Sequence, residues 1–333
     1  MISVIIPTYN SNKNIINCIK SIYYQKFKKF EIIVVDDCST DESVNNLKKF
    51  LKKKKIKKVN IIKNRKNLGP GPARNIGVKY SKYQNILFID SDVIIKKNTL
   101  KNFSQLISKY NVLVGVYDDS ITPGSILGNT KGIYYYTIFN KKLIKYEIFD
   151  AAIAGIKKKV FLQTSGYNLK MDKNIDFENE ELSYRIREKN EIYLTNKLKV
   201  KHVWPSNKKI LITLLNRSSH FVEFKLIKKN YFSNEIIGKK ELLKLLHNAV
   251  FSISLISNIF YGSINILVLS LLLTISFIII NLKYFVIIRK KKLNLLKYYF
   301  SLLIIQNIAF LGLLKGLLNF CSPNSLLKKK MRK

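Results

Sequence analysis

The chain has 333 residues, a net charge of +38 at pH 7 and a hydrophobic fraction of 47%. This length allows one large domain, or a domain with a membrane appendage. Lysine is frequent throughout the chain, so coding bias together with a preference for an anionic membrane surface is the expected cause of the charge. Nucleic-acid binding is not expected, because the lysine runs lack interleaved aromatic residues and no zinc-ligand or helix-turn-helix spacing occurs.

Apolar and amphipathic segments alternate along the first part of the sequence. Residues 2–6 (ISVII) are apolar at nearly every position, as in a strand buried on both faces. Further strands are expected at 30–35, 59–62 and 86–89, and helical patterns lie between them. Strands that alternate with helices predict a parallel, doubly wound α/β sheet.

Polar and acidic residues follow three of these strands. They are Pro7-Thr8-Tyr9, Asp36-Asp37 and Asp90-Ser91-Asp92. Ligands bind beyond the carboxyl ends of the strands in such sheets. In a chain this basic, carboxylates gathered there indicate a cation site. The Asp90-x-Asp92 pair suits Mg²⁺ or Mn²⁺, with substrate phosphates supplying further oxygen ligands, and such an ion stabilises charge on a departing diphosphate.

Several motifs resemble those of a known enzyme family. The segments SVIIPTYN, IIVVDDCSTDES, NLGPGPARNIGV and FIDSDV stand in the order and approximate spacing of the inverting family-2 glycosyltransferases, over roughly residues 1–240. The resemblance implies a GT-A fold, an α/β architecture with a mostly parallel, Rossmann-like sheet. It also implies a nucleoside-diphosphate-sugar donor.

The resemblance assigns roles to residues at the strand ends. It places Pro7 and Tyr9 at the nucleotide-sugar, with Tyr9 against the base and Asp37 accepting from the base imide. Arg74 would lie near the nucleotide, and Asp90 and Asp92 would address the ribose and the metal-diphosphate. The alternatives are that Tyr9 caps the core and that Arg74 pairs with a surface carboxylate.

The histidine of the KHVWP segment is a further candidate. His202 matches a histidine that many relatives carry near the diphosphate or metal, so it joins Asp92 as a candidate metal ligand. A lone histidine is equally compatible with a core position. Trp204 next to it is expected to serve packing.

The acceptor side departs from the family pattern. The segment FENEELSYR matches Glu-Asp-x-(Asp/Glu)-Leu-x-x-Arg, whose Asp is the general base, but Asn179 occupies the position of the base. An amide cannot take a proton at neutral pH, so the neighbouring Glu180 and Glu178 are the candidate catalytic carboxylates. Glu181 and Arg185 lie one helical turn apart and are expected to form a simple ion pair.

A membrane region is expected at the C-terminal end. No charged residue occurs between Ala249 and Leu282, and lysines flank this stretch. Because one crossing takes about 20 residues, we expect a helical hairpin over about 245–282 with its turn near Gly262. The positive-inside rule then places both flanking clusters in the cytoplasm. The alternative is a buried helical pair in a soluble protein.

The last apolar segment, about 298–321, is interrupted by Gln306 and Lys315, and an interfacial or re-entrant helix is expected there. The expected division is a GT-A domain at 1–240 and a membrane region at 241–333. The cysteines show no paired spacing and no signal peptide precedes the first strand, so the catalytic domain is expected in the cytosol, at the cytoplasmic (inner) membrane.

Together these features predict a metal-dependent inverting glycosyltransferase with a membrane-associated acceptor in cell-surface glycan synthesis. The acceptor would be a lipid-linked saccharide, a glycolipid or a polyprenyl phosphate. A phosphate is already ionised and needs no general base, so Asn179 mildly favours it. The alternative is a catalytically silent paralogue that binds nucleotide-sugar or acts as an assembly subunit, which Asn179 supports and the intact Asp90-x-Asp92 pair opposes.

Overall fold

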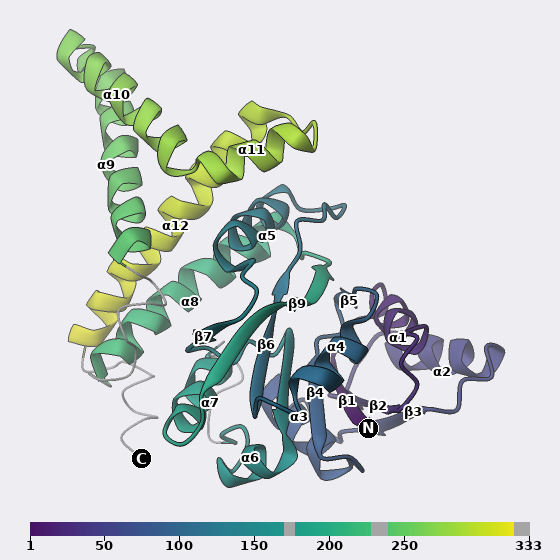
Figure 1. Cartoon of the computed structure of the whole chain (residues 1–333). Helices are drawn as coiled ribbons and strands as arrows, with labels where there is room; N and C mark the ends of the chain where they lie inside the picture. Colours follow the sequence, from purple (N-terminus) through teal and green to yellow (C-terminus); the bar gives the residue numbers. More distant parts are fainter. Residues whose placement is uncertain (170–176, 228–238, 323–333) are drawn as a thin grey trace. The chain divides into compact units, whose positions relative to one another are not determined.

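A computed structural model describes residues 1–169, 177–227 and 239–322 (Figure 1). The chain divides into two compact units. The first, called the sheet unit here, consists of Met1–Pro123 and Ile138–Val203. The second, called the helical unit, consists of Gly124–Thr137 and Trp204–Lys333. The boundary expected near residue 240 separates a catalytic domain from a membrane region, whereas these two units are defined by their internal packing. That expected boundary therefore stays a prediction.

The first half of the sheet unit has the predicted alternation. Strands β1 (Ile2–Thr8), β2 (Phe30–Asp36), β3 (Val59–Lys63) and β4 (Asn85–Ile89) are parallel, in the order β3-β2-β1-β4. Helices α1 (Ile15–Tyr23), α2 (Ser43–Lys53) and α3 (Pro70–Lys79) connect them. All four predicted strands are therefore confirmed, and their carboxyl ends share one edge of the sheet.

The second half of the sheet is mixed. Beyond β4 the order continues β8 (Ile153–Lys157), β6 (Val112–Tyr117), β9 (Ile192–His202) and β5 (Val93–Ile95), and β7 (Ile144–Tyr146) pairs with β9. Strand β8 runs antiparallel to β4 and β6. The start of β8 therefore lies at the same edge as the end of β4. Helices α4 (Thr99–Leu106), α6 (Lys158–Gln163) and α7 (Glu178–Arg187) complete this half.

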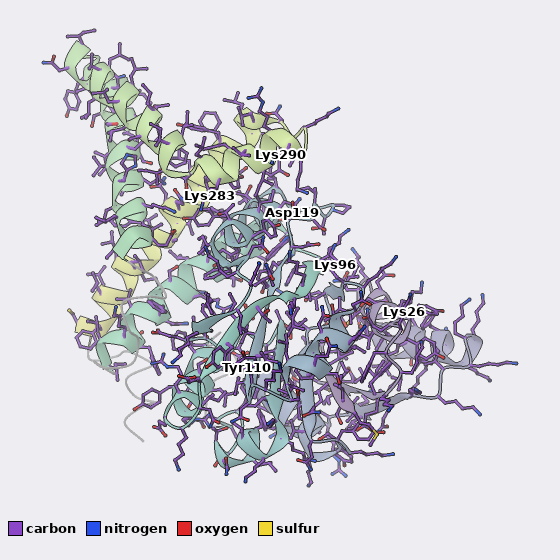
Figure 2. All side chains as sticks on the ribbon, viewed as in Figure 1. Lys26, Lys96, Tyr110, Asp119, Lys283 and Lys290 are labelled. Carbon is purple, nitrogen blue, oxygen red and sulfur yellow. The ribbon has the colours of Figure 1, made fainter. Side chains whose placement is uncertain are left out.

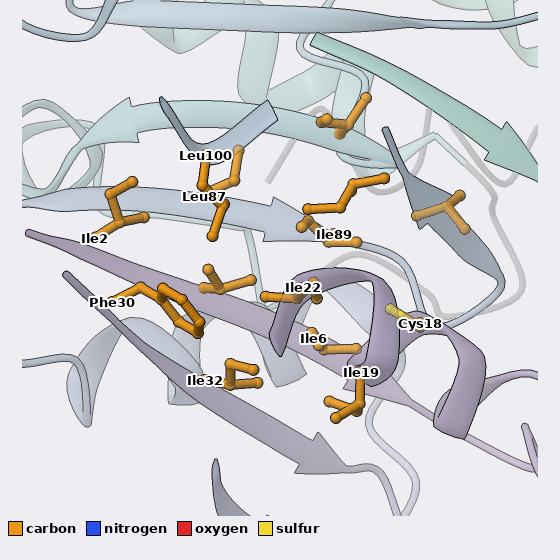
Figure 3. Packing of buried hydrophobic residues seen from close by; sticks show 14 of the residues in the cluster. Ile2, Ile6, Cys18, Ile19, Ile22, Phe30, Ile32, Leu87, Ile89 and Leu100 are labelled. Carbon is orange, nitrogen blue, oxygen red and sulfur yellow. The ribbon is translucent and has the colours of Figure 1, made fainter. Parts of the chain in front are cut away.

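Side chains alternate between two hydrophobic clusters across the sheet. From β1, Val4 and Ile6 join the cluster formed with α1, whereas Ile5 joins the cluster on the opposite face with Ala73 of α3. Figure 3 shows the first cluster, with Cys18, Ile19 and Ile22 of α1 among the side chains of the strands. Burial on both faces explains why β1 is apolar at successive positions.

The helical unit contains α5 (Ile126–Phe139), which crosses the boundary between the units at its last turn, and α8 (Asn207–Ile227). It continues with α9 (Lys239–Tyr261), α10 (Ile264–Ile280), α11 (Leu282–Lys290) and α12 (Leu295–Cys321). Helices α9 and α10 form a hairpin, because Ser270 donates to Ser254 over 3.2 Å and Phe251 packs on Phe277. The turn lies at Gly262, whose φ of 55° favours glycine. Helices α10 and α11 meet at an angle of 71°.

Helix α12 packs closely on α8 through two glycines spaced four residues apart. A side chain at Gly312 would collide with the Leu215 carbonyl, and one at Gly316 with the Ser219 carbonyl. Polar contacts extend this pairing, since Lys315 Nζ donates to Asn216 Oδ1 over 3.0 Å. The C-terminal half of α12 therefore lies directly against a helix rich in polar residues.

Large apolar side chains are exposed along the hairpin and α12. Exposure reaches 80% at Ile259 and 77% at Phe260 near the hairpin turn. On α12 large apolar side chains such as Leu296 and Leu318 are exposed together with Lys315, while the polar Gln306 and Ser301 are buried. Two helical stretches, Glu241–Tyr261 and Leu295–Cys321, are long and apolar enough to cross a membrane, and the bent α10–α11 pair would make a third.

Lysine side chains surround both units. Figure 2 shows Lys26 on the sheet unit and Lys283 and Lys290 on the helical unit, all of them exposed. Solvated side chains at these positions are compatible with either water or an anionic surface.

Candidate active site

Asp37 organises the loop that leads into α3. Its carboxylate accepts hydrogen bonds from Asn64 Nδ2 at 2.8 Å, from the Leu68 amide at 3.0 Å and from the Gly69 amide at 2.7 Å. The side chain is buried, and Gly69 adopts a φ of 95°, which lets its amide turn towards the carboxylate. Asp37 thus fixes the edge of the site at the ends of β2 and β3. Its predicted contact with a base stays a prediction.

Arg74 lies at the centre of the site. Its Nη2 donates to Asp90 Oδ1 over 2.7 Å, its Nη1 lies 3.6 Å from Glu178 Oε1, and its guanidinium lies 5.4 Å from the centre of the Tyr167 ring. Burial acts to lower the pKa of this guanidinium, but Tyr167, Asp90 and Glu178 outweigh it and raise the pKa. Arg74 is therefore a permanent cation. Its partners are site carboxylates, so the surface-pair alternative does not describe it.

Asp92 and His202 meet through the pairing of β5 with β9. Val93 is opposite His202 in this register, and the Val203 amide donates to the Asp92 carbonyl over 2.9 Å. Asp92 Oδ1 consequently lies 3.6 Å from His202 Nε2. The His202 ring also packs edge-on against Tyr117, with the ring centres 5.3 Å apart. The structure thus brings together the two residues predicted as metal ligands.

The donor set fits a hard divalent cation that a diphosphate helps to hold. A carboxylate oxygen and an imidazole nitrogen suit Mn²⁺, and the carboxylate suits Mg²⁺. Within the residues that the structure describes, no group of three His, Cys, Asp or Glu side chains could ligate an ion. An ion held by Asp92 and His202 would take further ligands from substrate phosphates and water, which is the usual arrangement for Mg²⁺.

The first turn of α7 carries the acidic segment predicted for catalysis. Glu178 faces Arg74, as described above, and Glu180 is buried. Asn179 is buried and its amide oxygen accepts from the Tyr167 hydroxyl over 3.0 Å. Glu181 accepts two hydrogen bonds from Arg185, at 2.8 and 2.5 Å, which confirms the predicted intrahelical pair.

The two residues at the end of β1 differ in exposure. Pro7 is buried and pairs in register with Val35 of β2. Tyr9 is 49% exposed just beyond the strand. A ring exposed to this extent does not cap the core, and it is available to stack on a planar ligand.

No individual role was predicted for three residues of the site, although Asp150 and Tyr167 lie in segments (150–161 and 166–168) that resemble the acceptor-side strand and loop of the family. Asn64 holds Asp37, Tyr167 covers Arg74, and Asp150 lies just before β8 with its carboxylate accepting from the Tyr117 hydroxyl over 3.3 Å. Asp150 comes directly before the apolar segment AAIAGI, as Asp90 follows an apolar strand. The structure shows why this position matters, because β8 runs antiparallel to β4 and its start lies at the same edge of the sheet as the end of β4.

Burial also sets the chemistry of two uncharged groups near the site. It raises the pKa of the Cys18 thiol, and the carboxylates of Asp92 and Asp90 add to the effect. Burial likewise raises the pKa of the Tyr167 hydroxyl, although Arg74 opposes this. Both groups therefore stay protonated at neutral pH, so neither is a nucleophile or a base.

Comparison with known sequences finds similarity in the first part of the chain. Residues 3–164 match the model described as Glycosyl transferase family 2. The poly(ribitol-phosphate) beta-N-acetylglucosaminyltransferase TarS of Staphylococcus aureus is 40% identical over 111 residues, which are 33% of this chain and 19% of that protein. Glycosyltransferase GlyG of Streptococcus pneumoniae is 32% identical over 119 residues, which are 35% of this chain and 39% of that protein. The similarity thus spans well under half of each relative.

Comparison with solved structures identifies the fold. The mannosyltransferase PcManGT from Pyrobaculum calidifontis, solved with GDP-Man and Mn²⁺, aligns with a TM-score of 0.65 at 15% identity and covers 95% of this chain and 86% of that one. GalNAc-T7, solved with UDP, GalNAc and Mn²⁺, aligns with a TM-score of 0.52 at 16% identity and covers 72% of this chain and 53% of that one. The predicted GT-A fold is confirmed.

Proposed function

We propose that this chain, whose residues 3–164 match the model described as Glycosyl transferase family 2, is a metal-dependent inverting enzyme that moves a sugar from a nucleoside-diphosphate-sugar to a membrane-associated acceptor. The observation that carries the proposal is the convergence of Asp90, held by Arg74, with the Asp92–His202 pair at one sheet edge. A structural ion-pair cluster would not need an exposed aromatic ring and a histidine beside it. Cell-surface glycan synthesis is the process that the names of the relatives support.

Each group has a task in this proposal. Tyr9 stacks on the base of the donor, while Asp37 and Asn64 shape the loop beside it. Asp92 and His202 hold a divalent ion, which supplies Lewis-acid stabilisation of the departing diphosphate. Arg74 fixes the Asp90 carboxylate, so that the polar groups around the donor are already oriented before it binds.

The apolar hairpin of α9 and α10 supports attachment to a membrane. Its exposed residues are apolar over the charge-free stretch between Ala249 and Leu282, and Lys244 and Lys283 lie just outside that stretch. Burying this surface in lipid is favourable, whereas exposing it to water is not. With both lysine-bearing ends in the cytoplasm, the hairpin satisfies the positive-inside rule.

Helix α12 suits a position in the plane of the membrane surface. Its C-terminal half packs on α8, and α8 carries Arg217 and Glu223 at that level. If residues 312–319 of α12 lay in the hydrocarbon core, the charged side chains of α8 beside them would lie in lipid as well, which is costly. An interfacial placement keeps α8 on the polar side and directs the exposed apolar side chains of α12 towards acyl chains.

Donor turnover by the full chain tests this function. The protein is purified in detergent or kept in native membranes and assayed with UDP- and GDP-linked sugars, with Mn²⁺, with Mg²⁺, and with a chelator. We expect metal-dependent release of nucleoside diphosphate from one donor and a labelled product in the lipid extract. Turnover that persists unchanged in chelator contradicts the metal-dependent part of the proposal.

A catalytically silent, nucleotide-binding paralogue is the second candidate. The specific observation in its favour is that Asn179 stands where the family base is expected and is buried against Tyr167. Nucleotide binding without turnover of any donor would favour this candidate, and the enzyme proposal would then fail.

A further inference from the structure

We propose, building on the transferase function above, that Asp150 is the general base of this enzyme and that the acceptor therefore presents a hydroxyl group rather than a phosphate. The family position for the base is Asn179, which cannot accept a proton. A hydroxyl acceptor still needs one removed, and the structure offers the carboxylate of Asp150, on a segment that is hydrogen-bonded to the helix carrying Asn179.

Asp150 is attached to the first turn of α7 through its neighbour. The Phe149 amide donates to Ser183 Oγ over 2.7 Å, and Ser183 Oγ in turn donates to the carbonyl of Asn179. The residue directly before Asp150 is thus linked to Asn179 by two hydrogen bonds. In this proposal Asp150, just before β8, supplies the carboxylate that α7 lacks at Asn179.

The Asp150 carboxylate also belongs to the donor side of the site. The Asp90 amide donates to the Ala152 carbonyl over 3.3 Å, which joins the end of β4 to the segment that carries Asp150. Asp150 is one of the charges that act on both Asp90 and Tyr167. It therefore lies near both Asp90 and the Tyr167 hydroxyl, which donates to Asn179.

Asp150 has the hydrogen bonds that a base requires and no cation that would neutralise it. Oδ1 accepts from the Ala152 amide at 3.1 Å and Oδ2 accepts from the Tyr117 hydroxyl at 3.3 Å. Across residues 1–169, 177–227 and 239–322, no lysine, arginine or histidine forms an ion pair with it. Two neutral donors orient the carboxylate and leave it free to take a proton.

Most neighbouring carboxylates already serve a cation. Glu178 faces Arg74, Glu181 is held by Arg185, and Asp118 pairs with Lys96. Protonating one of these carboxylates would disrupt an ion pair that the structure already contains. Glu180 is the remaining rival, and the experiment below includes it.

The step balances without any further reactant. The acceptor oxygen attacks the anomeric carbon of the donor while Asp150 takes its proton. The bond between that carbon and the diphosphate oxygen breaks, and its electron pair leaves with the nucleoside diphosphate. Asp150 then releases the proton to water. The products are the glycoside, the nucleoside diphosphate and one proton.

Four variants of the full chain test the assignment: Asp150→Asn, Glu180→Gln, Glu178→Gln and the double variant Asp150→Asn/Asn179→Asp. Glu191→Gln, a surface residue paired with Lys145, is the matched control. The readouts are the transfer rate, the affinity for the free nucleoside diphosphate, and the dependence of kcat/KM on pH. The titratable groups around Asp150 in that profile are Asp90, Tyr117, Tyr167 and the Arg74–Glu178 pair.

We expect Asp150→Asn to lower transfer about 100- to 10,000-fold, the usual contribution of a general base, while nucleotide affinity stays unchanged. The fall of kcat/KM at low pH should disappear with it. Restoring a carboxylate at position 179 should recover activity in the double variant, which a merely structural role of Asp150 does not predict. Should Asp150→Asn lose nucleotide binding, Asp150→Glu replaces it, and partial activity that still falls at low pH is expected.

Two results overturn the assignment while the transferase function stands. If Asp150→Asn transfers sugar at the wild-type rate and Glu180→Gln does not, Glu180 is the base. If all single variants transfer normally, no base is needed and the acceptor is a phosphate. A wild-type protein that transfers no sugar overturns the proposed function itself, and this inference with it.

Discussion

Arg74 Nη2 donates a hydrogen bond of 2.7 Å to Asp90 Oδ1, so a buried guanidinium fixes the first carboxylate of the Asp90-Ser91-Asp92 segment. The second carboxylate of the segment faces His202 instead. Two carboxylates that are two positions apart in the sequence thus have different partners. One is positioned by a cation of the protein, and the other remains available to a cation from solution.

Replacing Arg74 with Met should destabilise the fold and weaken donor binding together. Arg74 is buried but its partner Asp90 is 31% exposed, so the carboxylate left behind is partly solvated and the loss should be smaller than the roughly 3 to 5 kcal/mol expected when a fully buried pair is broken. Chemical denaturation in detergent measures the change in unfolding free energy. Lys145→Met, which breaks an exposed pair with Glu191, is the control and should leave stability unchanged. Arg74→Met with wild-type stability would contradict the buried network.

Replacing Asp92 with Asn or His202 with Gln should raise the Mn²⁺ concentration that gives half-maximal transfer. We expect the shift to reach at least the roughly 10- to 100-fold loss of metal affinity that follows removal of an outer partner of a ligand. A titration of activity with Mn²⁺ measures it, with Glu191→Gln as control. An unchanged titration for both variants would show that these residues do not hold the ion.

Replacing Asp37 with Asn should loosen the loop before α3. The substitution puts an NH₂ group where the Leu68 and Gly69 amides now donate to a carboxylate. Buried donors left without an acceptor cost about 1 to 3 kcal/mol each. Thermal unfolding and nucleotide affinity should both decline, whereas Glu188→Gln on the exposed end of α7 should change neither. A variant that unfolds normally yet loses nucleotide affinity would instead support direct base contact.

A charge on the hairpin should detach the chain from the membrane. Leu271 of α10 is 57% exposed, and Leu162 of α6 in the sheet unit is similarly exposed at 59%. A lysine at the centre of an inserted helix costs about 2.5 to 3.5 kcal/mol. Leu271→Lys should therefore move protein from the membrane pellet into the alkaline carbonate extract, and Leu162→Lys should not. Equal behaviour of both variants would argue against insertion of the hairpin.

The thiol of Cys18 should resist alkylation in the folded protein at pH 8. Burial raises the pKa of this thiol, so the reactive thiolate is scarce, and the side chain is also inaccessible. Cys38, which is partly exposed, should react under the same conditions. Mass spectrometry after iodoacetamide treatment distinguishes the two, and all three cysteines should react in guanidinium. Rapid native labelling of Cys18 would mean that α1 opens readily.

The sequence was most informative where strands are buried on both faces and end in polar residues. Such strands can be recognised in a sequence as short apolar runs. Because these strands are parallel, their carboxyl ends lie at one edge of the sheet. The sequence therefore predicted that Asp37, Asp90 and Asp92 lie in one site. The Asp92–His202 contact depends on the pairing of β5 with β9. Those strands are far apart in the chain, so only resemblance to a family could suggest that contact.

The acceptor half was less predictable for a physical reason. Strand β8 reverses direction relative to β4, and local patterns do not reveal whether a strand runs parallel or antiparallel. Asp150 therefore had no visible connection to Asp90. Glu178 and Glu180 were predicted to be catalytic because they flank Asn179 in the sequence. Their position in the sequence does not reveal that Glu178 faces Arg74.

The two units are interleaved along the sequence, because residues 138–203 of the sheet unit separate the two segments of the helical unit. The first of these segments is therefore synthesised before the second. Gly128 and Gly132 of α5 leave no room for side chains because Trp204 packs over them, and Tyr134 donates a hydrogen bond of 2.5 Å to Glu241. The segment Gly124–Thr137 thus leaves the ribosome well before the residues that complete its surroundings. For the same reason a single genetic crossover near residue 204 would separate α5 from its partners. Exchange of the membrane-bearing part between relatives would have to replace both segments at once.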